Sequence, residues 1–282
     1  LKRIRPERDC RELEQRIRSW WNICVLMLGA ILLGGATALL LFAFISYMAL
    51  KEYLSLIPTR RSDRRVLFWA YLTIPLQYYW ASIGWYGMFI IFVPVYAFLL
   101  IPVRKVLIGE TEDFLRSMGT IHWGLMTTVF SLSHAAFLLA LPEHISPAGG
   151  AGLLIYLVVL TEFNDVAQYI WGKRFGISKV VPGISPGKTW AGLIGGAATT
   201  LTLAIACASF FTPFTLLEAV GAGLIIGVTG FFGDVVISAV KRDIGIKDSG
   251  NLIPGHGGIL DRVDSLTFTA PLFFHYIYYL HY

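Results

Sequence analysis

The feature that most constrains this chain is a series of apolar runs, most of them close to the length of a membrane span, separated by short polar loops. An α-helix needs about twenty residues to cross roughly 30 Å of hydrocarbon. The runs lack the ten-residue alternation of a transmembrane β-barrel. Only 15% of the 282 residues are charged, compared with about 25% in soluble domains. We therefore predict an all-α, polytopic integral membrane protein.

The polar loops alternate in charge along the chain. The loops 51–65, 104–118, 173–188 and 241–264 carry Lys and Arg, whereas the turns between them carry none. By the positive-inside rule the basic loops face the cytoplasm. This pattern predicts about nine transmembrane helices. They comprise a short hairpin over 20–50 that turns at Gly34 and Gly35, a second hairpin over 66–82 and 86–103, helices near 119–141, 150–172, 189–211 and 216–240, and a last helix from about 265.

The chain divides into three parts of a single membrane domain. Residues 1–20 form a basic arm that we expect to lie in the cytoplasm, 21–163 are the N-terminal transmembrane helices, and 164–282 are a C-terminal transmembrane region that we expect to be catalytic because of its motifs. The formal net charge of +5 lies in the loops. It therefore indicates membrane orientation and anionic partners, and not nucleic-acid binding.

The stretch 234–265 gathers charged residues between two apolar runs. Asp234, Ser238, Lys241 and Arg242 stand at i, i+4, i+7 and i+8, so a continuing helix places them on one face. Asp234 then lies about two turns inside the helix end, where a lone carboxylate must pair with cations or bind a metal ion. The alternative is a salt bridge to Lys241 or Arg242.

A second group of charges opens the last predicted helix. Acids at a helix N-terminus suit the helix dipole, as Asp261 and Asp264 do, but Arg262 does not fit that explanation. Asp234 and Asp261 come from the two flanking helices. Together they could hold Mg²⁺, which prefers oxygen ligands and keeps positions for phosphate oxygens.

A glycine-rich turn lies between these two groups, with the sequence PGHGG over 254–258. Glycines let the backbone approach a ligand closely, and successive N–H groups can bind an anion. With the basic residues around it the turn becomes a candidate polyphosphate site. The candidate substrate-binding residues here are Lys247, Asp248, His256, Gly257 and Gly258. His256 could act as a base or only donate a loop hydrogen bond.

A second constellation covers 164–192. Asn164, Asp165 and Tyr169 lie within an apolar run, and Ser185 and Lys188 belong to the sequence SPGKT that opens the next helix. Free N–H groups at that helix start and Lys188 suit a phosphate. The spacing is not that of a P-loop. For Asp165 the alternative is a structural hydrogen bond to a neighbouring helix. Both constellations fall on the same predicted face, which suggests phosphoryl or nucleotidyl transfer to a membrane-embedded substrate.

These motifs resemble those of a known enzyme family. SAVKRDIGIKDSGNLIPGHGGILDRVDS over 238–265 is similar to the signature of CDP-diacylglycerol synthases, also called phosphatidate cytidylyltransferases. NDVAQYIWGKRFG and PGISPGKTW resemble the other two motifs of that family, in the same order. The similarity covers about 164–270; before that it is only topological.

The resemblance implies an integral membrane enzyme, usually a homodimer, in phospholipid biosynthesis. It would join CTP and phosphatidate to give CDP-diacylglycerol and pyrophosphate, with Mg²⁺ required and K⁺ assisting. The residues that match Asp234 and Asp261 would hold the metal ions, and those that match Lys241, Arg242, Lys247 and Arg262 would surround the phosphates. We expect a bacterial inner membrane, with the active site facing the cytoplasm.

The chain departs from the family at three positions. Ile237 and Ala191 stand where the family usually has Glu, and Gln168 stands where it favours a small residue. The chain is therefore identified as a divergent member whose lipid acceptor is left open. Two alternatives remain: a CTP-dependent lipid kinase or a cytidylyltransferase for another lipid phosphate, and a non-catalytic paralogue or transporter.

Overall fold

The computed structural model describes residues 11–57, 63–107, 109, 112–142, 146–250 and 257–282. In these ranges the chain is helical between short loops, and the only pairing of extended backbone is an isolated bridge between Lys179 and Thr189. The all-α prediction is confirmed.

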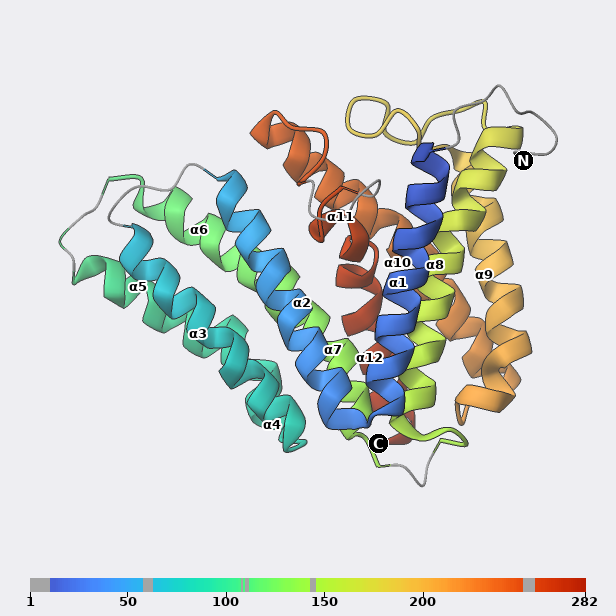
Figure 1. Cartoon of the computed structure of the whole chain (residues 1–282), viewed down its shortest axis with the longest axis horizontal. Coiled ribbons are helices and arrows are strands. Elements are labelled where there is room, and N and C mark those ends of the chain that lie inside the picture. Colours follow the sequence, from blue (N-terminus) through green and yellow to red (C-terminus); the bar gives the residue numbers. More distant parts are fainter. Residues whose placement is uncertain (1–10, 58–62, 108, 110–111, 143–145, 251–256) are drawn as a thin grey trace.

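The long helices form an up-and-down bundle (Figure 1). Their bounds are α1 Arg11–Leu32, α2 Gly35–Leu56, α3 Asp63–Ser82, α4 Tyr86–Ile91, η1 Phe92–Ala97, α5 Phe98–Val106, α6 Phe114–Leu125, η2 Met126–Phe130, α7 Ser131–Phe137, η3 Leu138–Ala140, α8 Gly149–Phe175, α9 Trp190–Phe211, α10 Leu216–Ile244, α11 Leu260–Val263 and α12 Leu266–His281.

The N-terminal hairpin turns where it was predicted, at Gly34, whose φ of 118° suits a glycine. Its two helices are not short, however, because α1 and α2 have 22 residues each. The apolar run marks only the part of each helix that needs a hydrocarbon environment. Both helices continue into polar sequence, and α1 begins at Arg11, inside the segment predicted as an arm.

Two of the predicted single helices contain π-helical segments. Tyr86–Val106 runs through the π-helix η1, and Phe114–Ala140 runs through η2. Pro94 lies within η1 and Pro102 within α5. A proline lacks the N–H that an α-helix needs at that position, so the local hydrogen-bond pattern changes.

Six helical segments of the described chain are long and apolar enough to cross a membrane: α2, Tyr86–Val106, Phe114–Ala140, α8, α9 and α10. In α1 only Arg18–Leu32 is apolar, and it is shorter. The protein is thus a polytopic membrane protein, while the predicted count of nine crossings stays a prediction.

Helices α8, α9 and α10 approach one another closely through small residues. A Cβ added to Gly227 of α10 would lie 2.8 Å from the Cα of Ala197 on α9. A Cβ added to Gly192 of α9 would lie 2.9 Å from the carbonyl oxygen of Gln168 on α8. Small residues let membrane helices pack at short backbone distances. This packing fixes the three helices that carry most of the predicted site.

The packing predicts opposite effects for two helix glycines. Gly227→Ala should destabilise the protein by about 1–3 kcal/mol, because the new methyl group meets backbone. Gly119→Ala in α6 should be neutral or slightly stabilising, because nothing lies within 4 Å of its added Cβ and alanine favours a helix. Thermal unfolding in detergent measures both variants. Equal unfolding temperatures would contradict the close packing.

Candidate active site

Two ion pairs of lysine and aspartate lie at the end of the bundle that carries the basic loops. Lys188 Nζ, from the loop before α9, is 2.6 Å from Oδ2 of Asp234 on α10. Lys241 Nζ, in the last turn of α10, is 2.6 Å from Oδ1 of Asp261 on α11. The alternative that paired Asp234 with Lys241 or Arg242 is wrong, because its partner is Lys188. The two constellations predicted to share a face therefore meet.

Asp165 and Asp264 lie beside these pairs. The Ser265 hydroxyl donates to Asp165 Oδ1 at 3.1 Å, and the Ser265 backbone N–H donates to Asp264 Oδ1 at 2.8 Å. Burial, together with the charges of Asp234 and Asp165, holds the pKa of Asp264 well above its usual value, while Lys241 acts in the opposite direction. Asp264 is thus within electrostatic reach of both ion pairs.

We call this group the carboxylate–lysine cluster; its members are Asp165, Lys188, Asp234, Lys241, Asp261 and Asp264.

Asp261 organises the loop that precedes it. Its Oδ2 accepts hydrogen bonds from the backbone N–H and hydroxyl of Ser249, both at 2.9 Å, and from the N–H of Gly258 at 3.2 Å. Burial alone would raise the pKa of Asp261, but the hydrogen bonds from Lys241 and Ser249 outweigh it and lower the pKa. Gly257 has a φ of 82°, which a glycine adopts without strain. Asp261 therefore has a structural role whatever else it binds.

Glu52, in the last turn of α2, is a site residue that the sequence reasoning missed. Its carboxylate accepts the N–H groups of Ile259 at 2.9 Å and Leu260 at 3.1 Å, and it shares the single hydroxyl hydrogen of Ser249 with Asp261. These N–H groups open α11, where a carboxylate is a favourable cap. The partners are about 200 residues apart in sequence, and no local pattern around Glu52 indicates them.

The two arginines predicted to bind phosphate are exposed. Arg242 donates from Nε to the carbonyl of Ile184 at 3.2 Å and from Nη1 to the carbonyl of Ile246 at 3.0 Å. It thereby ties the loop before α9 to the end of α10. Arg262 on α11 lies next to Asp261 in sequence, and its charge is within electrostatic reach of Glu162 on α8.

Four further predicted residues lie beside the cluster or on the loops around it. Ser238 donates to Asp234 Oδ1 at 3.2 Å and so belongs beside the cluster. Lys247 and Asp248 are exposed on the loop after α10. Ser185 is half-buried in the turn that leads to Lys188, whose backbone N–H donates to the Ser185 carbonyl.

Tyr169 and Asn164, both on α8, have their hydrogen-bond partners outside the carboxylate–lysine cluster. Tyr169 is 66% exposed, and its hydroxyl accepts from Lys173 at 3.2 Å. Asn164 is fully buried and links three helices: it donates to the carbonyl of Gly227 and accepts from the hydroxyl of Thr200. Its contacts explain it as a helix-packing residue. His256 lies outside the described residues.

Gln168 takes part in the site. Its Oε1 accepts from Lys188 Nζ at 2.9 Å, so Lys188 is held between Gln168 and Asp234. Gln168 is 5% exposed, and its Nε2 has no hydrogen-bond partner in the described structure. By contrast Ile237 is fully buried in the apolar core, and Ala191 is half-buried near the start of α9.

The cluster suits a divalent cation by atom type. It holds four carboxylates and two lysines, and carboxylate oxygens are the ligands that Mg²⁺ prefers. Within the described ranges no three His, Cys, Asp or Glu side chains are arranged around one metal position. The prediction that Asp234 and Asp261 bind the metal together stays a prediction, since the two carboxylates have separate partners.

The comparison with known proteins gives the same class of enzyme as the motifs. Residues 14–280 match the profile of the cytidylyltransferase family. Because this match covers almost the whole chain, the protein belongs to the cytidylyltransferase family and is a nucleotidyltransferase enzyme of the membrane.

Three relatives illustrate the range of similarity. The uncharacterized protein YnbB of Escherichia coli (strain K12) is 48% identical over 97% of this chain and 90% of its own length. The phosphatidate cytidylyltransferase of Staphylococcus aureus (strain COL) is 31% identical over 89% of this chain and 94% of its own. That of Haemophilus influenzae is 42% identical over 47% of this chain and 48% of its own.

Removing the Glu52 carboxylate should loosen α11. In Glu52→Ala the three donors lose a charged acceptor, so the apparent free energy of unfolding should fall by about 1–3 kcal/mol. The Ile259 and Leu260 amides should also exchange hydrogen faster. The matched control is Lys51→Ala, which removes an exposed side chain one residue away. If both variants unfold and exchange alike, Glu52 does not hold α11.

Proposed function

We propose that the protein transfers CMP from CTP to a membrane lipid phosphate, phosphatidate, giving CDP-diacylglycerol and pyrophosphate. The observation that carries the proposal is the carboxylate–lysine cluster, in which two ion pairs from separate elements lie beside two further carboxylates at one end of the membrane helices. The relatives named phosphatidate cytidylyltransferase support the choice of acceptor.

The proposed reaction needs no general base. A phosphate monoester has a second pKa of about 6 and is largely ionised near neutral pH. One of its oxygens attacks the α-phosphorus of CTP, the new P–O bond forms, and the bond to the β-phosphate breaks as pyrophosphate leaves. The difficulty is the repulsion between two anions. Positioned cations lower that repulsion and hold the reacting groups in line.

Lysine and arginine side chains at this end of the bundle would supply the cations. Lys188 and Lys241 are half-buried, and each can exchange a carboxylate for a phosphate oxygen. Arg242 and Arg262 are exposed beside them, and guanidinium groups bind phosphate in bidentate fashion. Lys247, on the loop after α10, would reach the distal phosphates of the nucleotide.

Asp234 and Asp261 would hold Mg²⁺, with K⁺ as a possible second ion. Each carboxylate already binds a lysine ammonium group at 2.6 Å, Lys188 and Lys241 respectively. Each therefore stabilises a cation in this structure. When bound, the metal would neutralise charge on the nucleotide phosphates. Asp234 is the more available of the two, since its side chain is 26% exposed against 9% for Asp261.

The setting of the reaction is part of the proposal. We expect the site to face the cytoplasm from a bacterial inner membrane, because basic loops gather at its end of the bundle, and we expect a homodimer.

One observation favours a second acceptor, a different lipid phosphate. Gln168 stands where the family favours a small residue, and its Nε2 is a buried donor without a partner beside Lys188.

The decisive experiment incubates the purified protein in detergent with α-labelled CTP, Mg²⁺ and phosphatidate. We expect label in the lipid fraction and release of pyrophosphate. Release of CDP together with unlabelled lipid would mean a lipid kinase instead. Label that appears only with another lipid phosphate would identify a different acceptor. No turnover with any lipid phosphate would mean a non-catalytic protein or a transporter.

The two cluster aspartates should respond differently to substitution. Asp234→Asn should reduce turnover by about a hundredfold or more with only a small fall in the unfolding temperature, because the Asn side chain can still hydrogen-bond Lys188 and Ser238. Asp261→Asn should reduce both turnover and the unfolding temperature, because its carboxylate organises the loop around Ser249 and Gly258. Full activity in Asp234→Asn would refute the site.

A further inference from the structure

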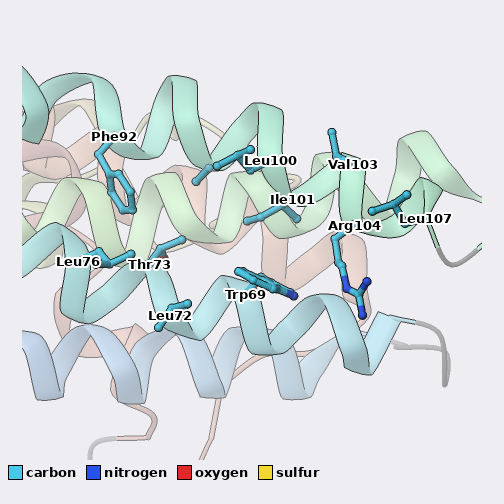
Figure 2. A pocket seen from close by; sticks show the side chains of 11 residues that line it. Trp69, Leu72, Thr73, Leu76, Phe92, Leu100, Ile101, Val103, Arg104 and Leu107 are labelled. Carbon is cyan, nitrogen blue, oxygen red and sulfur yellow. The ribbon is translucent and has the colours of Figure 1, made fainter.

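An apolar groove runs between α3 and α5, away from the helices that carry the active site. Its volume is about 270 Å³. Figure 2 shows its walls: Trp69, Leu72 and Leu76 come from α3, and Leu100 and Ile101 come from α5. The proposed reaction does not use this groove.

The groove exists because the segment opposite α3 is irregular. The π-helix η1 precedes α5, and Pro94 and Pro102 interrupt the regular hydrogen bonding of the segment. A π-helical segment has a wider turn and shifts the faces of the residues that follow. The side chains of α5 therefore do not interlock with those of α3 along their whole length.

The walls of the groove are open to the surroundings of the protein. Trp69 is 44% exposed, Leu72 36% and Leu100 64%. In a bilayer these surfaces face hydrocarbon, and an empty groove would forfeit dispersion contacts along its lining. A flexible hydrocarbon chain can fill such a space.

Arg104 marks one end of the groove. It lies in the last turn of α5, at the end of the bundle that carries the basic loops, and it extends from α5 toward α3 (Figure 2). Its Nε is buried and has no hydrogen-bond partner among the described residues. A guanidinium has a planar fork of donors that matches a phosphate. An anionic oxygen at the polar end of the groove would therefore satisfy the Arg104 guanidinium.

The size of the groove fits one acyl chain better than a whole lipid. It is smaller than the roughly 300–1,000 Å³ that hold a drug-sized ligand. From Trp69 to Leu76 the wall on α3 rises about 10 Å at 1.5 Å per residue. This is within the depth of one leaflet, about half of the 30 Å hydrocarbon core.

A neighbouring groove on the other side of α5 provides a contrast. It has a volume of about 230 Å³ and lies between α5 and α6, with His122 as its ionisable residue. Histidine has an ordinary pKa of about 6.5 and so carries no permanent charge. Only the α3–α5 groove, of these two, combines an apolar channel with a permanent positive charge.

We propose that the α3–α5 groove binds an anionic phospholipid, with one acyl chain between the two helices and the headgroup phosphate on Arg104. This lipid is a bound component of the protein and not its substrate. The inference is independent of the proposed reaction.

The first experiment locates the chain. The delipidated full-length protein is placed in vesicles of phosphatidylglycerol that carry a diazirine on one acyl chain, without CTP, and irradiated. We expect adducts on peptides of α3 and α5, at and around Trp69, Leu72 and Leu100. Adducts spread over all helices would overturn the proposal. So would the absence of adducts from α3 and α5, which would mean that a second copy of the chain covers them.

The second experiment tests the charge. Wild-type protein should give about fivefold more α3–α5 adduct with phosphatidylglycerol than with phosphatidylcholine that has the same acyl chains. This ratio corresponds to the roughly 1 kcal/mol that one basic residue near a membrane surface contributes to binding an anionic lipid. Arg104→Gln should lose this preference. Arg116→Gln, an exposed arginine of α6, should keep it. A preference retained in Arg104→Gln would refute the headgroup contact.

A third variant tests the groove without changing its charge, in case Arg104→Gln fails to fold. Leu100→Trp fills the groove without changing its charge, so adducts with both lipids should fall while the helical circular dichroism stays that of the wild type. Leu115→Trp, at an exposed position of α6, is its control and should leave both adduct yields unchanged. Undiminished labelling in Leu100→Trp would show that the chain lies elsewhere.

Discussion

Four carboxylates at one end of a bundle of membrane helices are the constraint on which the C-terminal half of the structure depends. Charges at such a place are costly unless cations from other segments meet them. Lys188 meets Asp234 and so fastens the loop before α9 to α10. Lys241 meets Asp261 and fastens α11 to the same helix. The two lysines thereby hold the loop before α9 and the helix α11 in place, and the carboxylate oxygens leave the cluster suited to a cation.

Sequence was sufficient for the helices because a membrane permits few alternatives: every backbone group in hydrocarbon must be paired within its own segment. The predicted starts of α8, α9 and α10 agree with the structure to within a residue. Charge alternation also placed both constellations on one face, as the Lys188–Asp234 pair confirms. The particular partners could not be predicted, because α10 offers Asp234 two nearer cations, and only tertiary packing selects Lys188.

Polar residues inside apolar runs illustrate the same limit. Asn164 and Asp165 are neighbours with similar sequence surroundings, yet Asn164 joins three helices and Asp165 faces the cluster. A helix turns by about 100° per residue, so adjacent side chains meet different neighbours. The residues that depart from the family pattern also differ in their surroundings. Ile237 packs in the core, whereas Gln168 holds Lys188 and presents a buried donor. Gln168 is therefore the substitution that bears most directly on the choice of lipid.

The contact between Glu52 and the start of α11 has a consequence for how the chain can be divided. The residues of the carboxylate–lysine cluster all come from the C-terminal part, which suggests a proposed catalytic half preceded by anchoring helices. Yet a carboxylate of the N-terminal hairpin holds the peptide groups that open α11, next to Asp261. The second helix is thus a structural component of the proposed site. Recombining the C-terminal part with the N-terminal half of a relative would preserve the chemistry only if a matching acid stood at the end of the second helix.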